Sequence, residues 1–446
     1  MELIGAQPGR KVIIYFAATI IIGTILLYLP VSSAGDSISL IDAFFTSTSA
    51  VCVTGLTVLD TGSDFSFFGQ VVILILIQLG GLGIMTFATS LLMMMGARVS
   101  FYDRIGIFED FGNWTRTGTI LAAIILTTIA IEGLGAAALY TQFSQEFPSD
   151  QAIFYSVFHS ISAFCNAGFS TFPNSLESYH GNLYIIGVFS FLIIIGGLGF
   201  IVIGEMFSRL FRFRNMLSLH AKLCLSVTGI LLFGGTVLFF AIEYNNCFGY
   251  MSFIDSLANA FFQSVTCRTA GFNTIPQANL TEVALLITLI LMFIGACPGS
   301  TGGGIKTTTA AVILLLVYNR FRGHKSIPVF KRSIDNDSIR RALTVILLAS
   351  LIIIVMFALL MLAEQKPQSH QLSQGWFVDN LFEVVSAFGT VGLSLGISGH
   401  STITGKLILI VLMFIGRVGL LTLAFSLARP VQAGEIVYAG ESVMIG

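Results

Sequence analysis

The sequence predicts an all-α polytopic membrane protein. Of its 446 residues, 55% are hydrophobic and 10% are charged, whereas a soluble domain carries about 25% charged residues. Apolar segments long enough to cross the hydrocarbon core of a bilayer recur along the whole chain. The high hydrophobicity also excludes a disordered chain, and the net charge of −1 gives no indication of a nucleic-acid partner.

Eight apolar segments are expected to span the membrane, and the distribution of charge orients them. Segments rich in Lys and Arg alternate with segments rich in Asp and Glu, which is the pattern of cytoplasmic and outer loops. This asymmetry requires an even number of spans and places both termini in the cytoplasm. We interpret the first span as a retained helix, because a signal peptide has a shorter apolar core. The spans are expected at 12–29, 68–95, 117–140, 183–208, 223–243, 283–317, 342–363 and 404–428.

Each outer segment contains a further apolar stretch that is too short to cross the membrane. Such lengths are typical of re-entrant helices. These stretches cover 41–51, 152–164, 253–265 and 377–388. Each leads into a glycine, and the preceding residues match in register. The chain is therefore predicted to be a fourfold repeat around a pseudo-fourfold pore, each unit being a span, a pore loop and a second span. The units are 12–95, 117–208, 223–317 and 342–428, followed by a cytoplasmic tail at 429–446.

Four loops at membrane depth predict a cation pathway. Irregular backbone survives there only when it is buried in protein or lines a watery cavity. Carbonyl oxygens around one axis can replace the hydration shell of a monovalent cation, and the C-terminal ends of short helices carry a partial negative charge. Glycine suits a carbonyl turned to the axis because it tolerates positive φ. The candidate ion-binding residues are Val53, Thr54, Gly55, Asn166, Ala167, Gly168, Thr269, Ala270, Gly271, Thr390, Val391 and Gly392.

Two other residue patterns have a structural alternative. For the glycine runs 80–83 and 196–199, we favour the interpretation that small residues allow helices to pack closely. Acidic residues on the outer side would concentrate cations, but capping alone is the favoured role for those near the starts of the short helices. The outer acidic residues are Asp36, Asp42, Asp60, Asp64, Glu146, Asp150, Glu177, Asp255, Glu282, Glu364, Asp379 and Glu383.

The sixth span contains a glycine-rich interruption at 295–304, which we interpret as a gate. Proline breaks a helix, and the position just below the third glycine loop suits an obstruction. A passive kink is the alternative. A buried arginine needs carboxylate or carbonyl partners, so Arg417 is expected to hold this loop shut, and Lys306 to anchor its inner end or to snorkel. The candidate gate residues are Gly295, Pro298, Gly299, Gly302, Gly303, Gly304, Lys306 and Arg417.

Four polar residues in apolar surroundings are expected to be mainly structural. Glu132 lies mid-span, where it could pair with a basic residue, bind sodium or cap a helix, and we favour pairing. His159 and Asn166 are expected to support the second loop by hydrogen bonds. Arg268 is expected to bond outer carboxylates or backbone near the third loop. The six cysteines are expected to pack in the core.

These motifs resemble the Trk/Ktr/HKT potassium transporter superfamily, most closely its KtrB-type membrane subunits. The matching stretches cover 48–56, 158–169, 261–273, 299–306, 385–393 and 415–422. The resemblance implies channel-like K⁺ uptake through the cell membrane, with K⁺ at the filter backbone and Na⁺ as a stimulating ion. It also implies a homodimer and a cytoplasmic KtrA-type ring, and a regulatory nucleotide is expected only on that partner. Glycine at position 55 favours potassium within this superfamily.

Three alternatives remain open from the sequence. The first is a sodium-preferring or weakly selective cation transporter of the same fold, and four dissimilar filter strands favour weaker discrimination than a symmetric channel. The second is the potassium-conducting subunit of an ATP-driven pump, which is usually longer. The third is an intramembrane enzyme, which we disfavour because Glu132, His159 and Glu205 are too scattered to form a catalytic site.

Overall fold

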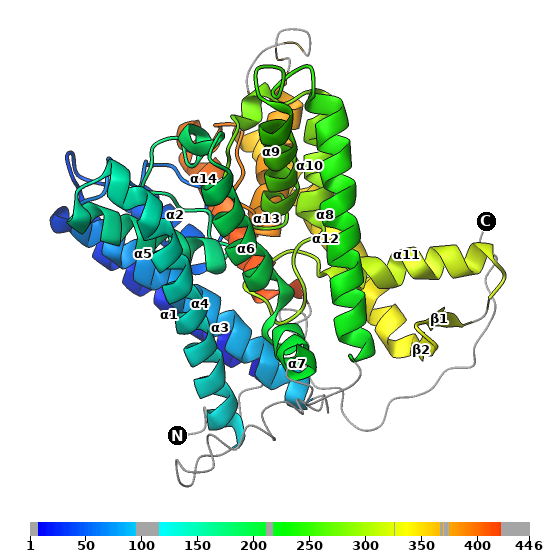
Figure 1. Cartoon of the computed structure of the whole chain (residues 1–446). Helices are drawn as coiled ribbons and strands as arrows, with labels where there is room; N and C mark the ends of the chain where they lie inside the picture. The colour runs from blue at the N-terminus through cyan, green and yellow to red at the C-terminus, as the bar shows by residue number, and fades with distance from the viewer. Residues whose placement is uncertain are drawn as a thin grey trace.

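The computed structural model describes residues 8–94, 116–210, 217–324, 326–365, 369, 373 and 375–420, and these are predominantly helical (Figure 1). The helices that correspond to the expected spans are α1 (Pro8–Tyr28), α3 (Phe67–Met94), α4 (Arg116–Glu146), α6 (Leu183–Leu198), α7 (Phe200–Leu210), α8 (Leu219–Glu243), α10 (Glu282–Phe293), α11 (Thr307–Phe321), α12 (Asn336–Ala363) and α14 (Ile403–Val418). Four further helices correspond to the short apolar stretches expected between the spans and are called the short helices below: α2 (Leu40–Val51), α5 (Ser149–Phe164), α9 (Phe253–Thr266) and α13 (Trp376–Gly389). Single 3-10 turns lie at Pro30–Ser32, Glu177–Tyr179, Gln277–Asn279 and Ser398–His400. The tail at 429–446 and the end of the last expected span lie outside the described residues.

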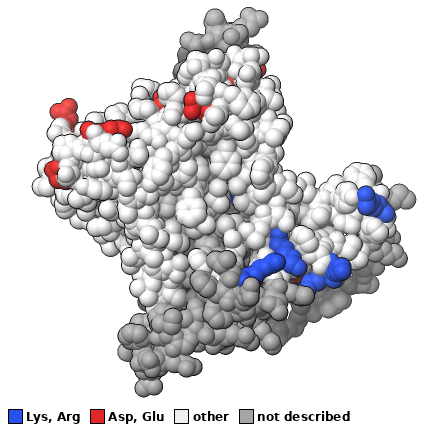
Figure 2. All heavy atoms as spheres, in the orientation of Figure 1, with Lys and Arg blue, Asp and Glu red and all other residues white. Residues whose placement is uncertain are grey.

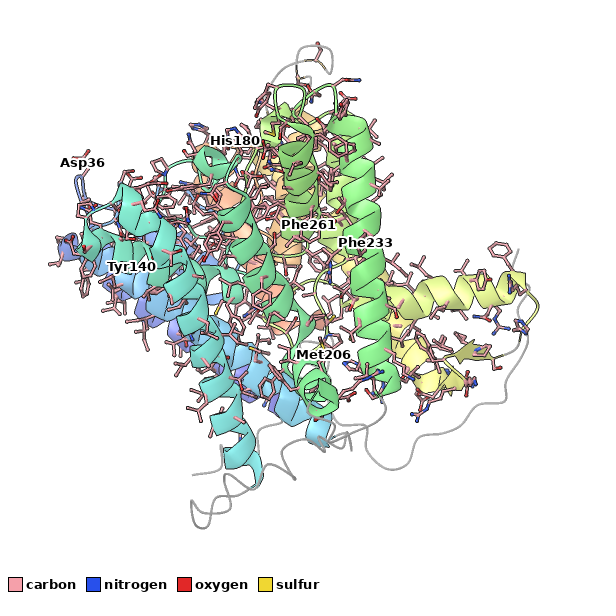
Figure 3. All side chains as sticks on the ribbon, viewed as in Figure 1. Asp36, Tyr140, His180, Met206, Phe233 and Phe261 are labelled. Atoms are coloured by element: carbon pink, nitrogen blue, oxygen red, sulfur yellow. The ribbon has the colours of Figure 1, made fainter. Side chains whose placement is uncertain are left out.

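Each of the four short helices packs against the long helix that precedes it: α2 on α1, α5 on α4, α9 on α8 and α13 on α12. Their aligned phenylalanines, Phe45, Phe158, Phe262 and Phe382, are fully buried in one continuous apolar core. The large apolar side chains on the outer faces of the long helices are instead exposed. Phe233 of α8 points outward (Figure 3) and is 77% exposed, as expected for a surface that faces lipid.

Local capping explains where two of the short helices begin. The hydroxyl of Ser39 accepts the N–H of Asp42 at 3.2 Å and donates to its carboxylate at 2.6 Å. Ser252 and Asp255 repeat this arrangement at the start of α9, at 3.2 and 2.7 Å. The serines therefore cap both helices, whereas each aspartate carboxylate accepts a bond from its capping serine and not from a helix N–H.

Within the described residues, five helices are long and apolar enough to cross a membrane: Gly9–Tyr28, Phe67–Thr86, Leu121–Glu146, Leu219–Glu243 and Asn336–Ala363. The expected span at 183–208 is wrong as a single helix, because α6 and α7 meet at an angle of 102°. Gly199 between them has φ +84°, and a Cβ there would lie 2.6 Å from the carbonyl oxygen of Pro298. The glycine-rich loop thus occupies the bend, which makes a side chain impossible at this position.

The expected interruption in the sixth span is present. Helix α10 ends at Phe293 and α11 begins at Thr307. The all-α prediction missed one feature: an antiparallel hairpin of β1 (Ile327–Val329) and β2 (Arg332–Ile334). Its two turn residues, Phe330 and Lys331, have φ of +49° and +63°, as a tight hairpin turn requires. Strands of three residues are too short to show an alternating pattern in the sequence.

Charge is separated along the molecule (Figure 2). Acidic side chains gather at one end, and Lys and Arg gather at the opposite end, around the hairpin and the neighbouring ends of α11 and α12. In Figure 3, Asp36 and His180 lie toward the acidic end and Met206 lies toward the other. This separation of charge between the two ends of a largely apolar body is typical of a membrane protein.

Candidate functional site

The chain that follows each short helix has the same unusual backbone in all four places. Two residues before each aligned glycine, a non-glycine residue has positive φ: Val53 +54°, Asn166 +58°, Thr269 +69° and Thr390 +49°. The glycines themselves have φ of +88°, +71°, +79° and +93° at Gly55, Gly168, Gly271 and Gly392. Left-handed backbone costs a non-glycine residue about 1–2 kcal/mol, so its presence in four places indicates a shared constraint.

Hydrogen bonds to the preceding helix hold three of these loops alike. The N–H groups of Thr54, Ala167 and Val391 donate to the carbonyls of Ser49, Ser162 and Ser386 at 2.8, 2.8 and 2.9 Å. The third loop differs, because Ala270 N–H donates to Thr266 at 3.0 Å. The hydroxyls of Ser162 and Thr266 donate to the carbonyls of Phe169 and Phe272, one residue past the glycine. These bonds tie each loop to its own short helix. They leave the aligned glycine of each loop to contact the neighbouring loops.

The four glycines form a closed ring in chain order. A Cβ added to any of them would collide with the main chain of the next loop, so no side chain fits. Such an atom would lie 2.4 Å from Ala167 O at Gly55, 2.9 Å from Ala270 O at Gly168, 2.5 Å from Val391 O at Gly271 and 2.2 Å from Thr54 O at Gly392. The structure therefore brings together the glycine of every predicted loop with the carbonyl that precedes the next glycine.

The four glycines of the ring line a cavity of about 640 Å³. Of the acidic residues expected on the outer side, Asp60 and Glu177 line this cavity. Asp36, Asp42 and Asp64 line a separate recess. Partial burial raises the pKa of Glu177, an effect opposed by the hydrogen bond from the Asn273 amide at 3.0 Å.

Other outer carboxylates are engaged in the protein itself. Glu364 accepts the N–H and hydroxyl of Thr402 at 2.7 and 2.8 Å and so caps α14. Asp42 forms a 2.7 Å ion pair with Lys406. Because Asp42 lies on α2 and Lys406 on α14, this ion pair joins the first and last quarters of the molecule. Among the described residues, the carboxylates of Glu364 and Asp42 therefore have structural roles.

The glycine-rich loop lies directly beneath the ring. A Cβ on Gly302 or Gly303 would lie 2.1 Å from the hydroxyl oxygen of Thr269 or Thr390. Those two hydroxyls, and that of Thr54, are buried without a hydrogen-bond partner among the described residues. Unpaired buried hydroxyls are costly, and those of Thr269 and Thr390 face the glycine-rich loop.

The loop is held by main-chain bonds to the bend of α6. Cys297 N–H donates to Gly197 at 3.0 Å, and Thr301 N–H donates to Gly196 at 3.2 Å. At its own base, Gly295 N–H bonds Ile305 at 2.8 Å, while Pro298, Gly299 and Gly304 complete the turn. Both Gly299 and Gly304 have positive φ. Each of these contacts requires the glycine backbone to approach closely.

Two basic side chains bond the carbonyls of this loop. The guanidinium of Arg417 donates to the carbonyl of Thr301 and, at 2.8 Å, to that of Gly80 in α3. The Nζ of Lys306 donates to Gly302 at 2.6 Å. The contacts expected from the sequence are thus present, and Lys306 does not extend to the aqueous boundary as a snorkelling residue would.

Glu132 and Arg268 differ from expectation. Glu132 accepts the Gln78 amide at 3.0 Å and contacts the Cys165 thiol, and no basic partner for it lies in the described part of the chain. Arg268 is buried and donates to the Thr228 hydroxyl at 3.3 Å, not to an outer carboxylate. The sequence places Arg268 within the third loop but does not determine toward which side its long side chain turns.

The supporting roles expected at the second loop are present. The ring nitrogens of His159 lie 2.8 Å from the Tyr155 carbonyl and 3.0 Å from the Ser170 hydroxyl, and the ring stacks on Phe172. The amide of Asn166 is placed to donate to Ile193 O at 3.2 Å. All six cysteines are buried. Gln78, which bonds Glu132, carried no distinguishing signal in the sequence.

Glycines in the second helix of three quarters allow close approach to the short helices, as favoured from the sequence. A Cβ at Gly80, Gly196 or Gly416 would lie about 2 Å from the carbonyl oxygen of Val51, Phe164 or Phe388. These carbonyls end the short helices. The glycine run thus positions each short helix against its neighbour.

Comparison with known proteins agrees with this geometry. The sequence profile of the TrkH family, described as a cation transport protein, matches residues 6–434. The chain belongs to this family. It is therefore a membrane protein with cation transporters as relatives, which accords with its apolar helices.

Relatives within the family are similar over nearly their whole length. The chain is 41% identical to Ktr system potassium uptake protein B of Bacillus subtilis, covering 98% of this chain and 97% of the relative. It is 39% identical to potassium/sodium uptake protein NtpJ of Enterococcus hirae, covering 99% and 97%. The crystal structure of the potassium transporter TrkH from Vibrio parahaemolyticus has the same fold, with a TM-score of 0.78 at 21% identity over 96% of this chain and 86% of that one.

Proposed function

We propose that this TrkH-family chain is the pore-forming, channel-like subunit of a Ktr-type potassium uptake system. The observation that carries the proposal is the closed ring of Gly55, Gly168, Gly271 and Gly392, each beside a carbonyl of the next loop. Carbonyls in such a ring replace the water around K⁺. The names of the relatives, Ktr system potassium uptake protein B among them, support potassium as the ion.

The architecture proposed for this function is four membrane–pore-loop–membrane units around the ring. Each unit pairs a long helix, a short helix and a second helix that is continuous, bent or broken. The short helices α2, α5, α9 and α13 end beside the ring, so their C-terminal partial negative charges stabilise a cation there. Both termini are placed in the cytoplasm, with the basic end of Figure 2 on that side.

The glycine-rich loop is the proposed gate. It lies beneath the ring and is held by Arg417 and Lys306 through carbonyl oxygens. Arg417 has no carboxylate partner among the described residues, and a guanidinium stays protonated, so its uncompensated positive charge beside the pathway opposes the passage of K⁺ while the loop is in place. Opening then requires the loop to leave these two side chains.

The proposed partners follow from the system to which the relatives belong. A Ktr system contains a further subunit, and we assign to this chain a cytoplasmic KtrA-type ring that carries the regulatory nucleotide. A homodimer, stimulation by Na⁺ and contact with membrane lipid complete the proposal. The name of the Enterococcus hirae relative, a potassium/sodium uptake protein, favours one second candidate: a weakly selective transporter of K⁺ and Na⁺ on the same ring.

Uptake in a host that lacks its own potassium transporters tests the proposal. Expression of this chain should restore growth at low K⁺, and co-expression of the regulatory subunit should make the uptake depend on nucleotide. Exchanging Gly55 for Ser should lower the preference for K⁺ over Na⁺. Uptake of Na⁺ at the rate of K⁺ by the unmodified chain would favour the second candidate, and no cation uptake in either form would refute the proposal.

A further inference from the structure

A basic pocket lies away from the ring, between the end of α11, the hairpin and the start of α12. Its volume is about 310 Å³, the space of roughly ten water molecules in the liquid. This is enough for a phosphate group with an attached glycerol. The lining residues are Leu316, Asn319, Arg320, His324, Ile327, Asn336, Ile339 and Arg340.

The ionisable side chains that line this pocket are all basic. Arg320, His324 and Arg340 line it, and no carboxylate does. Neither arginine forms an ion pair with a residue that the structure describes. Two carboxylates at the start of α12, Asp335 and Asp337, do not line the pocket. Asp335 accepts the N–H of Ser338 at 2.9 Å as the cap of α12.

The surroundings of the pocket are apolar on one side. Leu314, Val317, Tyr318 and Phe321 lie at helical spacing along one face of α11, and all four are exposed, Phe321 to 89%. Helix α11 runs across the direction of α8 (Figure 1). A helix with an exposed apolar stripe and a basic end is typical of the boundary between headgroups and acyl chains.

We propose that this pocket binds the phosphate headgroup of an anionic phospholipid of the cytoplasmic leaflet. Arg320 and Arg340 bond the phosphate oxygens, the side-chain carbonyl of Asn319 accepts a headgroup hydroxyl, and the acyl chains follow the stripe on α11. Basic pockets between membrane helices on the cytoplasmic side bind anionic lipid headgroups in this manner. An acidic partner protein is disfavoured, because the site is a concave pocket beside an apolar stripe.

Binding of single lipid molecules to the purified full chain in detergent tests this, because no charged bilayer surface is then present. Native mass spectrometry should show phosphatidylglycerol bound in preference to phosphatidylcholine. The Arg320→Gln/Arg340→Gln variant should lose about fivefold in affinity per arginine, roughly 25-fold together. The matched variant Lys331→Gln/Arg332→Gln removes two charges from the hairpin, outside the pocket, and should lose far less.

Three results would overturn the assignment: equal binding of phosphatidylcholine, equal losses in the two variants, or displacement of the lipid by inorganic phosphate at equal concentration. The last would identify the ligand as free phosphate. Hydrogen exchange of the unmodified chain gives a test that needs no variant. Residues 316–340 should be protected by phosphatidylglycerol and not by inorganic phosphate. Because binding is measured and not transport, failure here leaves the proposed ion pathway untouched.

Discussion

Replacing Gly55 with Ala tests the ring most directly. A Cβ at this position lies 2.4 Å from the carbonyl oxygen of Ala167, about 1 Å closer than ordinary contact allows. The residue also has φ +88°, which costs an alanine about 1–2 kcal/mol. Overpacking adds about 1–3 kcal/mol, and it is relieved by pushing the Ala167 carbonyl out of place. An interaction with a charged group is worth about 1.5–3 kcal/mol, so losing this carbonyl should lower K⁺ affinity by about 10- to 100-fold.

Gly396 provides the matched control for this experiment. Its φ is +92°, almost that of Gly55, but a Cβ there meets nothing within 4 Å. The Gly396→Ala variant therefore carries the backbone strain without the collision. Flux of K⁺ and Na⁺ into proteoliposomes measures the affinity and preference of both variants, with thermal unfolding to confirm that each is folded. Wild-type K⁺ affinity in Gly55→Ala, or an equal loss in Gly396→Ala, would refute the reasoning.

Three further experiments test other parts of the molecule. Replacing Arg417 with Gln removes the charged bond to the Thr301 carbonyl, so the loop amides should exchange hydrogen roughly 10- to 100-fold faster. Because partial burial raises the pKa of Glu177, its carboxylate becomes neutral at a higher pH than a free glutamate. Cation uptake at low ionic strength should therefore fall as the pH drops through this raised pKa. Replacing Glu364 with Ala removes the cap on Thr402 and should lower the free energy of unfolding by about 1–3 kcal/mol, measured as a lower thermal midpoint.

Conservative variants serve as controls for these three experiments. Arg417→Lys keeps the charge and should leave exchange slower than Arg417→Gln does. Glu177→Gln should remove the pH response, and the same response in that variant would exclude this carboxylate as its source. Glu364→Gln keeps an oxygen acceptor, so it should lose less stability than Glu364→Ala, and equal losses would contradict the capping role.

The sequence predicts the elements of this fold because length and apolarity decide them. The aligned glycines indicated that the four loops are equivalent, because a position with no room for a Cβ requires glycine in every repeat. The closed order of the ring and the left-handed φ of Val53 do not follow from residue type. The bend at Gly199 was missed because a similar run at 80–83 remains helical, and the difference lies in a distant segment, Pro298–Gly299, that enters the bend. The direction of Arg268 is likewise set by packing partners far away in the chain.

The ring of four glycines is made by one polypeptide, and this has a consequence for how it can change. In an assembly of four identical subunits, any substitution appears four times at once. In this chain a substitution appears only once, so three of the four loops keep their geometry while the fourth changes. With the ring in its proposed role, ion preference can be adjusted in small steps during evolution, and each loop can acquire a separate function, as the third has done by preceding the glycine-rich loop.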